Sequence, residues 1–234
     1  ELLERCRLRN FRYSPLGLRD GLLAQMAADY SRSARSRQQI ATERWDSVLH
    51  CARQYGVELH HALQVRDFAL ELFGRLQSLH GLPPEYQEWL SAAAMLYEVG
   101  TYINRNGRYR HAYYVISHSD ILGYTPQQRL IIAAIARYLG TSVPLPSDAP
   151  LKAIPSSERA NVARACLLLR LARALNLGRR DAVRDVRVQL RESKVLLTVA
   201  AKRGTDVELE IWALERERNY FREALGRELS TAIA

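Results

Sequence analysis

The sequence predicts a mainly helical protein followed by a small α+β unit. Apolar residues recur at α-helical spacing from about residue 38 to residue 177. After Gly178 the repeat changes to alternate residues, which is the period of a β-strand. The 234 residues are 47% hydrophobic and 25% charged, and no run of about 18 apolar residues is present to span a membrane. We therefore expect a globular protein with a helical core.

The first 37 residues are predicted to form a helix and a linker. Ser14-Pro15 precedes a helical apolar pattern that ends near Tyr30, and proline is favoured in the first turn of a helix. Residues 31–37 are serine and arginine with one alanine, which indicates a polar linker. The chain lacks an initiating methionine and a signal peptide. We interpret it as a fragment of a longer protein, with a domain boundary after residue 37.

Helical patterns then follow one another, separated by glycine and proline. A proline-rich loop is expected between the last two helices, at residues 142–156. The predicted helices cover residues 38–55, 58–79, 83–100, 111–118, 126–139 and 158–177. Together they define a helical domain over residues 38–180.

Residues 181–234 are predicted to form the α+β unit. Apolar residues alternate over 186–190, 195–199 and 207–211, which predicts a three-stranded antiparallel sheet. A helical pattern over 214–233 predicts a C-terminal helix that covers one face of this sheet.

Cysteine content and charge restrict the environment and the partners of the chain. The three cysteines Cys6, Cys51 and Cys166 lie far apart and form no CxxC pair, so neither a disulfide framework nor a zinc site is predicted, and a reducing cytoplasm fits best. A net charge of +9 predicts an anionic partner. The alternative is a solvated basic surface without a site.

Two clusters of basic residues are the candidate anion-binding residues. In the first, arginines and a histidine surround a glycine turn that leads into a helix, where backbone amides also favour anions. The second cluster ends a helix, where cations alternatively stabilise the helix dipole. The predicted contacts are Arg105, Arg108, Arg110 and His111 in the first cluster, and Arg170, Arg173, Arg179 and Arg180 in the second.

Four further positions resemble the metal ligands of an HD domain, a helical metal-dependent phosphohydrolase scaffold. His61 matches the first histidine, Tyr97-Glu98 stands in place of the His-Asp pair, and Asn176 stands in place of the last aspartate. Tyrosine and neutral asparagine are poor ligands for a catalytic divalent ion. We therefore predict a degenerate HD-like domain that holds no metal.

The surrounding sequence resembles the C-terminal region of the exopolyphosphatase and guanosine pentaphosphate phosphohydrolase family. The matching stretches are YSPLGLRDGLL at 13–23, LYEVG at 96–100, YIN at 102–104, RYRHAYYVI at 108–116 and SDILGY at 119–124. The resemblance implies that residues 1–37 close an actin-like domain whose remainder, with the catalytic site, precedes this chain. No catalytic residue is therefore expected in this chain, and Mg²⁺ is expected only for the full-length enzyme.

The resemblance implies that this chain is part of a cytoplasmic bacterial exopolyphosphatase. This chain would bind inorganic polyphosphate and form a homodimer contact, and alone it would be inactive. Three alternatives stay open: a guanosine pentaphosphate phosphohydrolase of the same family, an autonomous HD phosphohydrolase, and a helical nucleic-acid-binding module. The last is disfavoured because the aromatic residues, 8% of the chain, are scattered.

Overall fold

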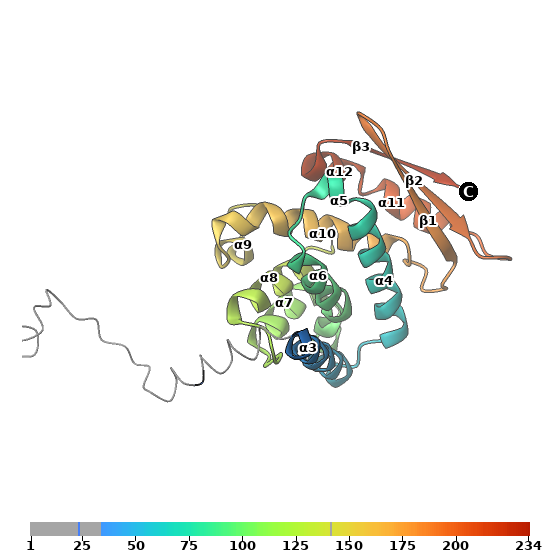
Figure 1. Ribbon diagram of the computed structural model, residues 1–234. Helices are drawn as coiled ribbons and strands as arrows, with labels where there is room; N and C mark the ends of the chain where they lie inside the picture. Colours follow the sequence, from blue (N-terminus) through green and yellow to red (C-terminus); the bar gives the residue numbers. More distant parts are fainter. Residues whose placement is uncertain (1–22, 24–33, 141) are drawn as a thin grey trace, which may run out of the picture. The chain divides into compact units, whose positions relative to one another are not determined.

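The computed structural model describes residue 23, residues 34–140 and residues 142–234 (Figure 1). Apart from residue 23, the predicted helix before Tyr30 and the start of the predicted linker lie outside the described residues. The first described helix, α3 (Ala34–Gln54), begins inside the predicted linker, whose last residues include the good helix formers alanine and arginine. Residues 1–43 and residues 44–234 form separate units, and only the second is discussed below.

The predicted helices of residues 38–180 are present, with short elements between them. The chain continues through α4 (Leu59–Arg75), α5 (Gln77–His80), α6 (Glu85–Leu96), the 3-10 helix η1 (Val99–Tyr102), α7 (Arg108–His118), α8 (Pro126–Arg137), α9 (Ala149–Lys152), η2 (Ser156–Glu158) and α10 (Arg159–Ala174). The proline-rich loop at 142–156 contains the single turn of α9.

Local sequence signals explain where several of these helices begin and end. Thr125 caps α8 by accepting a hydrogen bond from the Gln128 amide, at 3.3 Å, and the Gln128 side chain accepts one from the Thr125 amide, at 3.0 Å. Gly81 has a left-handed φ of 58° directly after α5, a conformation that glycine adopts without strain. Proline at the start of α8 adds to its capping box.

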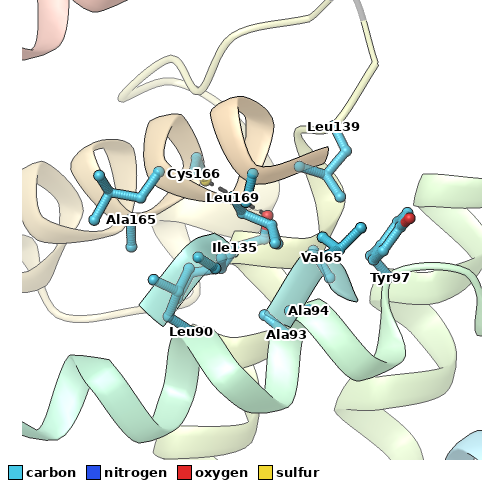
Figure 2. Packing of buried hydrophobic residues seen from close by; sticks show 14 of the residues in the cluster. Val65, Leu90, Ala93, Ala94, Tyr97, Ile135, Leu139, Ala165, Cys166 and Leu169 are labelled. Carbon is cyan, nitrogen blue, oxygen red and sulfur yellow. Dashed lines mark hydrogen bonds between the residues drawn. The ribbon is translucent and has the colours of Figure 1, made fainter. Parts of the chain in front are cut away.

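The helical core lies where α4, α6, α8 and α10 meet (Figure 2). Ala93 and Ala94 of α6 are fully buried, and their small side chains allow the helices to approach closely. Cys166 of α10 is also fully buried, and its thiol contacts the Ile135 carbonyl oxygen of α8 at 3.6 Å. The core fixes the positions of α4 and α10, which carry functional side chains described below.

The sheet differs from its prediction because its third strand comes from another segment. Strands β1 (Val183–Leu190) and β2 (Lys194–Ala201) form the predicted antiparallel hairpin. Strand β3 (Glu228–Ile233) pairs in parallel with β2, so the sheet is mixed and has the order β1-β2-β3. The prediction of a purely antiparallel sheet with a third strand at 207–211 was therefore wrong.

Residues 207–211 instead lead into helix α11 (Glu208–Glu215), which is followed by α12 (Arg218–Leu225). The buried positions Val207, Glu210 and Leu214 are three and four residues apart, which is helical spacing that the alternating apolar residues concealed. These two helices return the chain to the start of β2, and such a crossover allows parallel pairing. The predicted C-terminal helix over 214–233 consequently ends at Leu225, and residues 228–233 are a strand.

Among the described residues, no helix is both long and apolar enough to cross a bilayer. The predicted domain limits at residues 37 and 180 stay a prediction.

Candidate functional site

A cleft of about 610 Å³ lies beside α4, η1, α7 and the C-terminal end of α10. The four positions that resemble HD ligands all line this cleft, although 115 residues separate the first from the last. Its lining comprises Tyr55, Gly56, Val57, Glu58, His61, Tyr97, Glu98, Thr101, Tyr102, Arg105, Arg108, Arg173, Asn176, Leu177 and Arg179. The structure therefore brings the HD-like positions and part of both basic clusters to one place.

At the floor of the cleft, His61 takes part in a buried hydrogen-bond network. Its Nε2 lies 2.7 Å from the Tyr97 hydroxyl, and its Nδ1 lies 3.0 Å from the Asn176 amide nitrogen. That amide nitrogen also donates to Gln64 Oε1 at 2.7 Å. An amide NH₂ group only donates, so Nδ1 is the acceptor and the imidazole proton is on Nε2. His61 consequently donates to Tyr97.

The network is electrically neutral at pH 7. Burial and then the nearby Arg179 guanidinium lower the pKa of His61, so its imidazole stays neutral. Burial raises the pKa of the Tyr97 phenol, which therefore stays protonated. The floor of the cleft thus offers hydrogen bonds without a charge.

These residues do not fit the divalent metal that an HD domain holds. A metal ligand must offer a free lone pair, but His61 Nδ1 accepts from Asn176 and Nε2 carries the proton. Glu98, the carboxylate nearest to this network in sequence, is paired with Arg179. The part of the chain that the structure describes contains no group of three His, Cys, Asp or Glu side chains placed to hold a metal ion.

Arg179 lies at the mouth of the cleft between two carboxylates. Its Nη1 is 3.0 Å from Glu58 Oε2, and its Nη2 pairs with Glu98. Its backbone has a φ of 53°, which is uncommon for a residue other than glycine. The pair with Glu58 is exposed, and exposed ion pairs contribute little free energy, whereas the Glu98 side chain is only 12% exposed.

Arg108 occupies the first position of α7, after Gly107, whose φ is 74°. The Arg108 guanidinium lies over the Tyr109 ring at 4.8 Å and donates to the Tyr109 hydroxyl at 3.0 Å. Arg105 is exposed and lines the same cleft. Together with Arg110 they also line an adjoining cavity of about 310 Å³.

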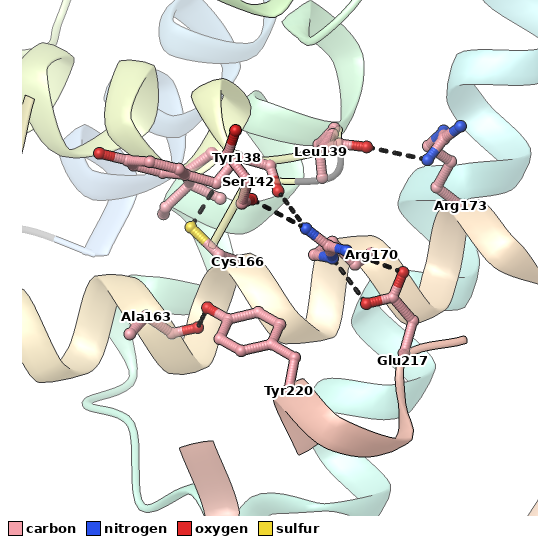
Figure 3. Close-up of polar contacts among 10 residues, drawn as sticks. Tyr138, Leu139, Ser142, Ala163, Cys166, Arg170, Arg173, Glu217 and Tyr220 are labelled. Carbon is pink, nitrogen blue, oxygen red and sulfur yellow. Dashed lines mark hydrogen bonds and ion pairs between the residues drawn. The ribbon is translucent and has the colours of Figure 1, made fainter. Parts of the chain in front are cut away.

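Arg173 and Arg170 project from α10 in different environments (Figure 3). Arg173 donates to the Leu139 carbonyl oxygen at 2.9 Å and lines the cleft. Arg170 is buried and forms a bidentate pair with Glu217, at 2.6 and 3.1 Å, while Nη1 donates to the carbonyl oxygens of Tyr138 and Ser142. Arg170 therefore holds α10 to two neighbouring segments.

A second cavity of about 310 Å³, the Trp212 cavity, adjoins the cleft. Arg108, Arg173 and Leu177 line both, so the two form one continuous basic groove. Its lining also includes Trp212 of α11 and Arg216, directly after that helix. Sequence reasoning missed both, because the predicted strand ended at residue 211 and the predicted helix began at residue 214, so the two residues were not placed on one element. The spacing of four between these residues was the available signal, since it places them on one helix face.

Of the eight predicted contacts, the structure brings Arg105, Arg108, Arg173 and Arg179 to the cleft. Arg110 lies in the adjoining cavity, and Arg170 reaches the Trp212 cavity. The half-buried His111 and the exposed Arg180 line none of these three cavities.

Comparison with known proteins identifies the family. The family model described as "Ppx/GppA phosphatase, domain III" matches residues 44–218. A protein of Photobacterium profundum named guanosine-5'-triphosphate,3'-diphosphate pyrophosphatase is 30% identical over 187 residues, which cover 79% of this chain and 35% of that protein. A protein of the same name from Aeromonas salmonicida is 36% identical over 91 residues, covering 38% of this chain and 18% of that protein.

The matches thus span at most about a third of these two relatives. The family model, in contrast, covers more than half of this chain, including the HD-like positions and both basic clusters. The chain therefore belongs to the Ppx/GppA phosphatase family, whose domain III it contains.

Proposed function

We propose that this chain is the part of a Ppx/GppA phosphohydrolase that holds the phosphate chain of inorganic polyphosphate. The observation that carries this proposal is the arrangement of Arg105, Arg108, Arg173 and Arg179 around one cleft whose floor is neutral. Guanidinium groups form charge-assisted, often bidentate hydrogen bonds to phosphate oxygens.

The arginines differ in how far their charge is already balanced. Arg108 and Arg173 contact a phenol and a carbonyl oxygen, and no carboxylate of the described residues pairs with either. Arg170 is neutralised by the buried Glu217, so we assign it to packing and not to the ligand. Arg108 and Arg173 are therefore the principal contacts.

We expect this cleft to bind its ligand without hydrolysing it. A general base needs a free lone pair within reach of water, but both nitrogens of His61 are engaged. We infer that the catalytic group belongs to the remainder of a full-length enzyme. Dimerisation, a Mg²⁺ requirement of that enzyme and a cytoplasmic location are further predictions from the family resemblance.

The second candidate ligand is a guanosine pentaphosphate. The names of the two relatives favour it, since both refer to guanosine-5'-triphosphate,3'-diphosphate. The same arginines would hold its phosphates, so both candidates share the proposed anion site.

Binding of short and long polyphosphate at two salt concentrations tests this proposal. The log-log salt slope is expected to be on the order of 0.7 per phosphate contact, by analogy with single-stranded nucleic acids. Arg108→Gln and Arg173→Gln should each cost roughly 1–2 kcal/mol of binding. Arg203→Gln, at an exposed position in the turn after β2, is the matched control and should cost little. Equal losses in all three variants, or no dependence on polymer length, would leave only a diffuse basic surface.

Phosphate release separates this proposal from an autonomous HD phosphohydrolase. The isolated chain should release no phosphate from polyphosphate. Turnover that disappears in His61→Ala or Glu98→Gln would refute the binding role and support the hydrolase.

A further inference from the structure

We propose that the Trp212 cavity is a nucleobase-stacking subsite. A nucleotide would place its base against the indole of Trp212 and its phosphates on Arg108 and Arg173. This inference rests on the proposed function, because it uses two arginines of the same anion site. It adds a part of the ligand, a planar aromatic base, that polyphosphate lacks.

The first observation is the exposure of Trp212. Trp212 is 51% exposed, whereas Trp89 is only 7% exposed and Trp45 is half-buried. Helix α11 is attached through its buried residues Glu210, Ala213 and Leu214, so Trp212 is not needed to hold it in place. A large aromatic side chain left open to solvent at the wall of a cavity is typical of a ligand-binding surface.

The second observation is the mixed chemistry of the cavity. Leu139, Ala174, Leu177 and Ala213 provide apolar walls, and Arg108, Arg173 and Arg216 provide positive charge. Apolar walls gain nothing from a bare phosphate chain. They do gain from a base, whose faces and ring carbons are apolar, and aromatic side chains stack on any of the bases.

The third observation is the position of Arg216. Its guanidinium carbon lies 4.9 Å from the centre of the Trp212 ring, as in a cation–π contact. This contact orients the indole and adds a charge beside it. The base is therefore expected on the indole with its phosphates directed towards Arg108 and Arg173, which the cavity shares with the cleft.

The lining is not suited to distinguish one base from another. Recognition of guanine N1–H and N2–H requires an acceptor such as a carboxylate. Glu217 is the carboxylate among the described residues of this lining, and both of its oxygens are bonded to Arg170. The Leu139 carbonyl oxygen accepts from Arg173. Stacking without base selection is therefore expected.

Binding of GTP, ATP and inorganic tripolyphosphate to the chain tests the inference. These three probes carry similar charge and the same number of linked phosphates. GTP and ATP should bind with similar affinity, about tenfold more tightly than tripolyphosphate, because stacking on an aromatic side chain adds to the phosphate contacts. Binding should also quench part of the tryptophan fluorescence.

Trp212→Ala should reduce the affinity for GTP and ATP to that for tripolyphosphate, and should leave tripolyphosphate binding unchanged. Trp212→Phe should retain part of the advantage of the nucleotides. Leu209→Ala is the matched control, since Leu209 is 39% exposed on the same helix and does not line the cavity. Circular dichroism spectra of all variants check that α11 remains folded.

The outcomes separate this inference from the proposed function. If tripolyphosphate binds and the nucleotides bind no more tightly, or if Trp212→Ala weakens all three probes alike, the stacking subsite is refuted and the anion site stands. If GTP binds far more tightly than ATP, the cavity distinguishes guanine from adenine by hydrogen bonds, which contradicts stacking without base selection. If none of the probes binds, the anion site itself is refuted.

Discussion

Gly100 of η1 is the position where one added methyl group should disturb both the fold and the cleft. A Cβ atom there would lie 1.9 Å from the Arg108 carbonyl oxygen, 2.4 Å from the Ala112 nitrogen and 2.9 Å from the His111 carbonyl carbon. All three are backbone atoms of α7, so no side-chain rotation relieves the clash. Gly100→Ala therefore requires α7 to move away from η1 by more than about 1 Å, judged from normal contact distances of roughly 3.5–4.0 Å.

The expected loss of unfolding free energy is about 3 kcal/mol, the upper end for overpacking in a core. For a chain of this size that loss lowers Tm by roughly 6–12 °C. Because α7 begins at Arg108, the same displacement should weaken polyphosphate binding in the protein that remains folded.

Gly74→Ala provides the matched control for thermal denaturation and polyphosphate binding. Gly74 lies in the last turn of α4, and nothing lies within 4 Å of an added Cβ atom. This variant should be stabilised by about 0.5–1 kcal/mol, since alanine is the better helix former. If Gly100→Ala changes Tm by no more than the control does, the close approach of η1 and α7 is not a feature of the folded protein.

Three further predictions concern histidine protonation, the buried Arg170–Glu217 ion pair and metal content. Burial lowers the pKa values of His61 and His80, so the unfolded chain binds more protons, and stability measured by urea unfolding should fall as pH decreases below about 6.5; His80→Gln should flatten this dependence. Glu217→Gln should destabilise the chain by about 3 kcal/mol, because it leaves the buried Arg170 charge unpaired; an unchanged midpoint would contradict this. Elemental analysis should find no stoichiometric Mn, Fe or Zn, and one equivalent lost in His61→Ala would overturn our interpretation of the HD-like positions.

The helical part of the fold was predictable because its signals are long and repeated. Helices such as α4 and α10 present an apolar stripe over four or more turns, and a proline or glycine near each end fixes its limits. The HD-like positions were also found from sequence, through their resemblance to the ligand positions of an HD domain. Their meeting in one cleft follows from the packing of α4 against α6 and α10.

The C-terminal unit was less predictable because its elements are short. In residues 207–211 apolar residues alternate as they do in a strand. A helix as short as α11 buries only a few residues three or four positions apart, and a five-residue segment is too short to distinguish this helical pattern from alternation. Parallel pairing of β3 depends on contacts with β2, about 34 residues earlier in the chain. Because the predicted strand ended at residue 211 and the predicted helix began at residue 214, Trp212 was assigned to neither element.

The roles of individual arginines could not be read from the sequence because they depend on distant partners. Glu217, 47 residues from Arg170, neutralises its charge, while Arg173, three residues further along the same helix, contacts only a carbonyl oxygen among its hydrogen-bond partners in the described chain. A carbonyl oxygen orients a guanidinium without removing its charge, whereas a carboxylate does both.

This distinction also separates Arg179 from Arg108 and Arg173 within the cleft. Arg179 must release Glu58 and Glu98 before it can bind a phosphate, and the freed carboxylates then repel the same anion. Arg108 and Arg173 need to release no carboxylate among the described residues. The phosphate chain should therefore contact Arg108 and Arg173 in preference to Arg179, and the Glu58 and Glu98 carboxylates should disfavour a phosphate beside them.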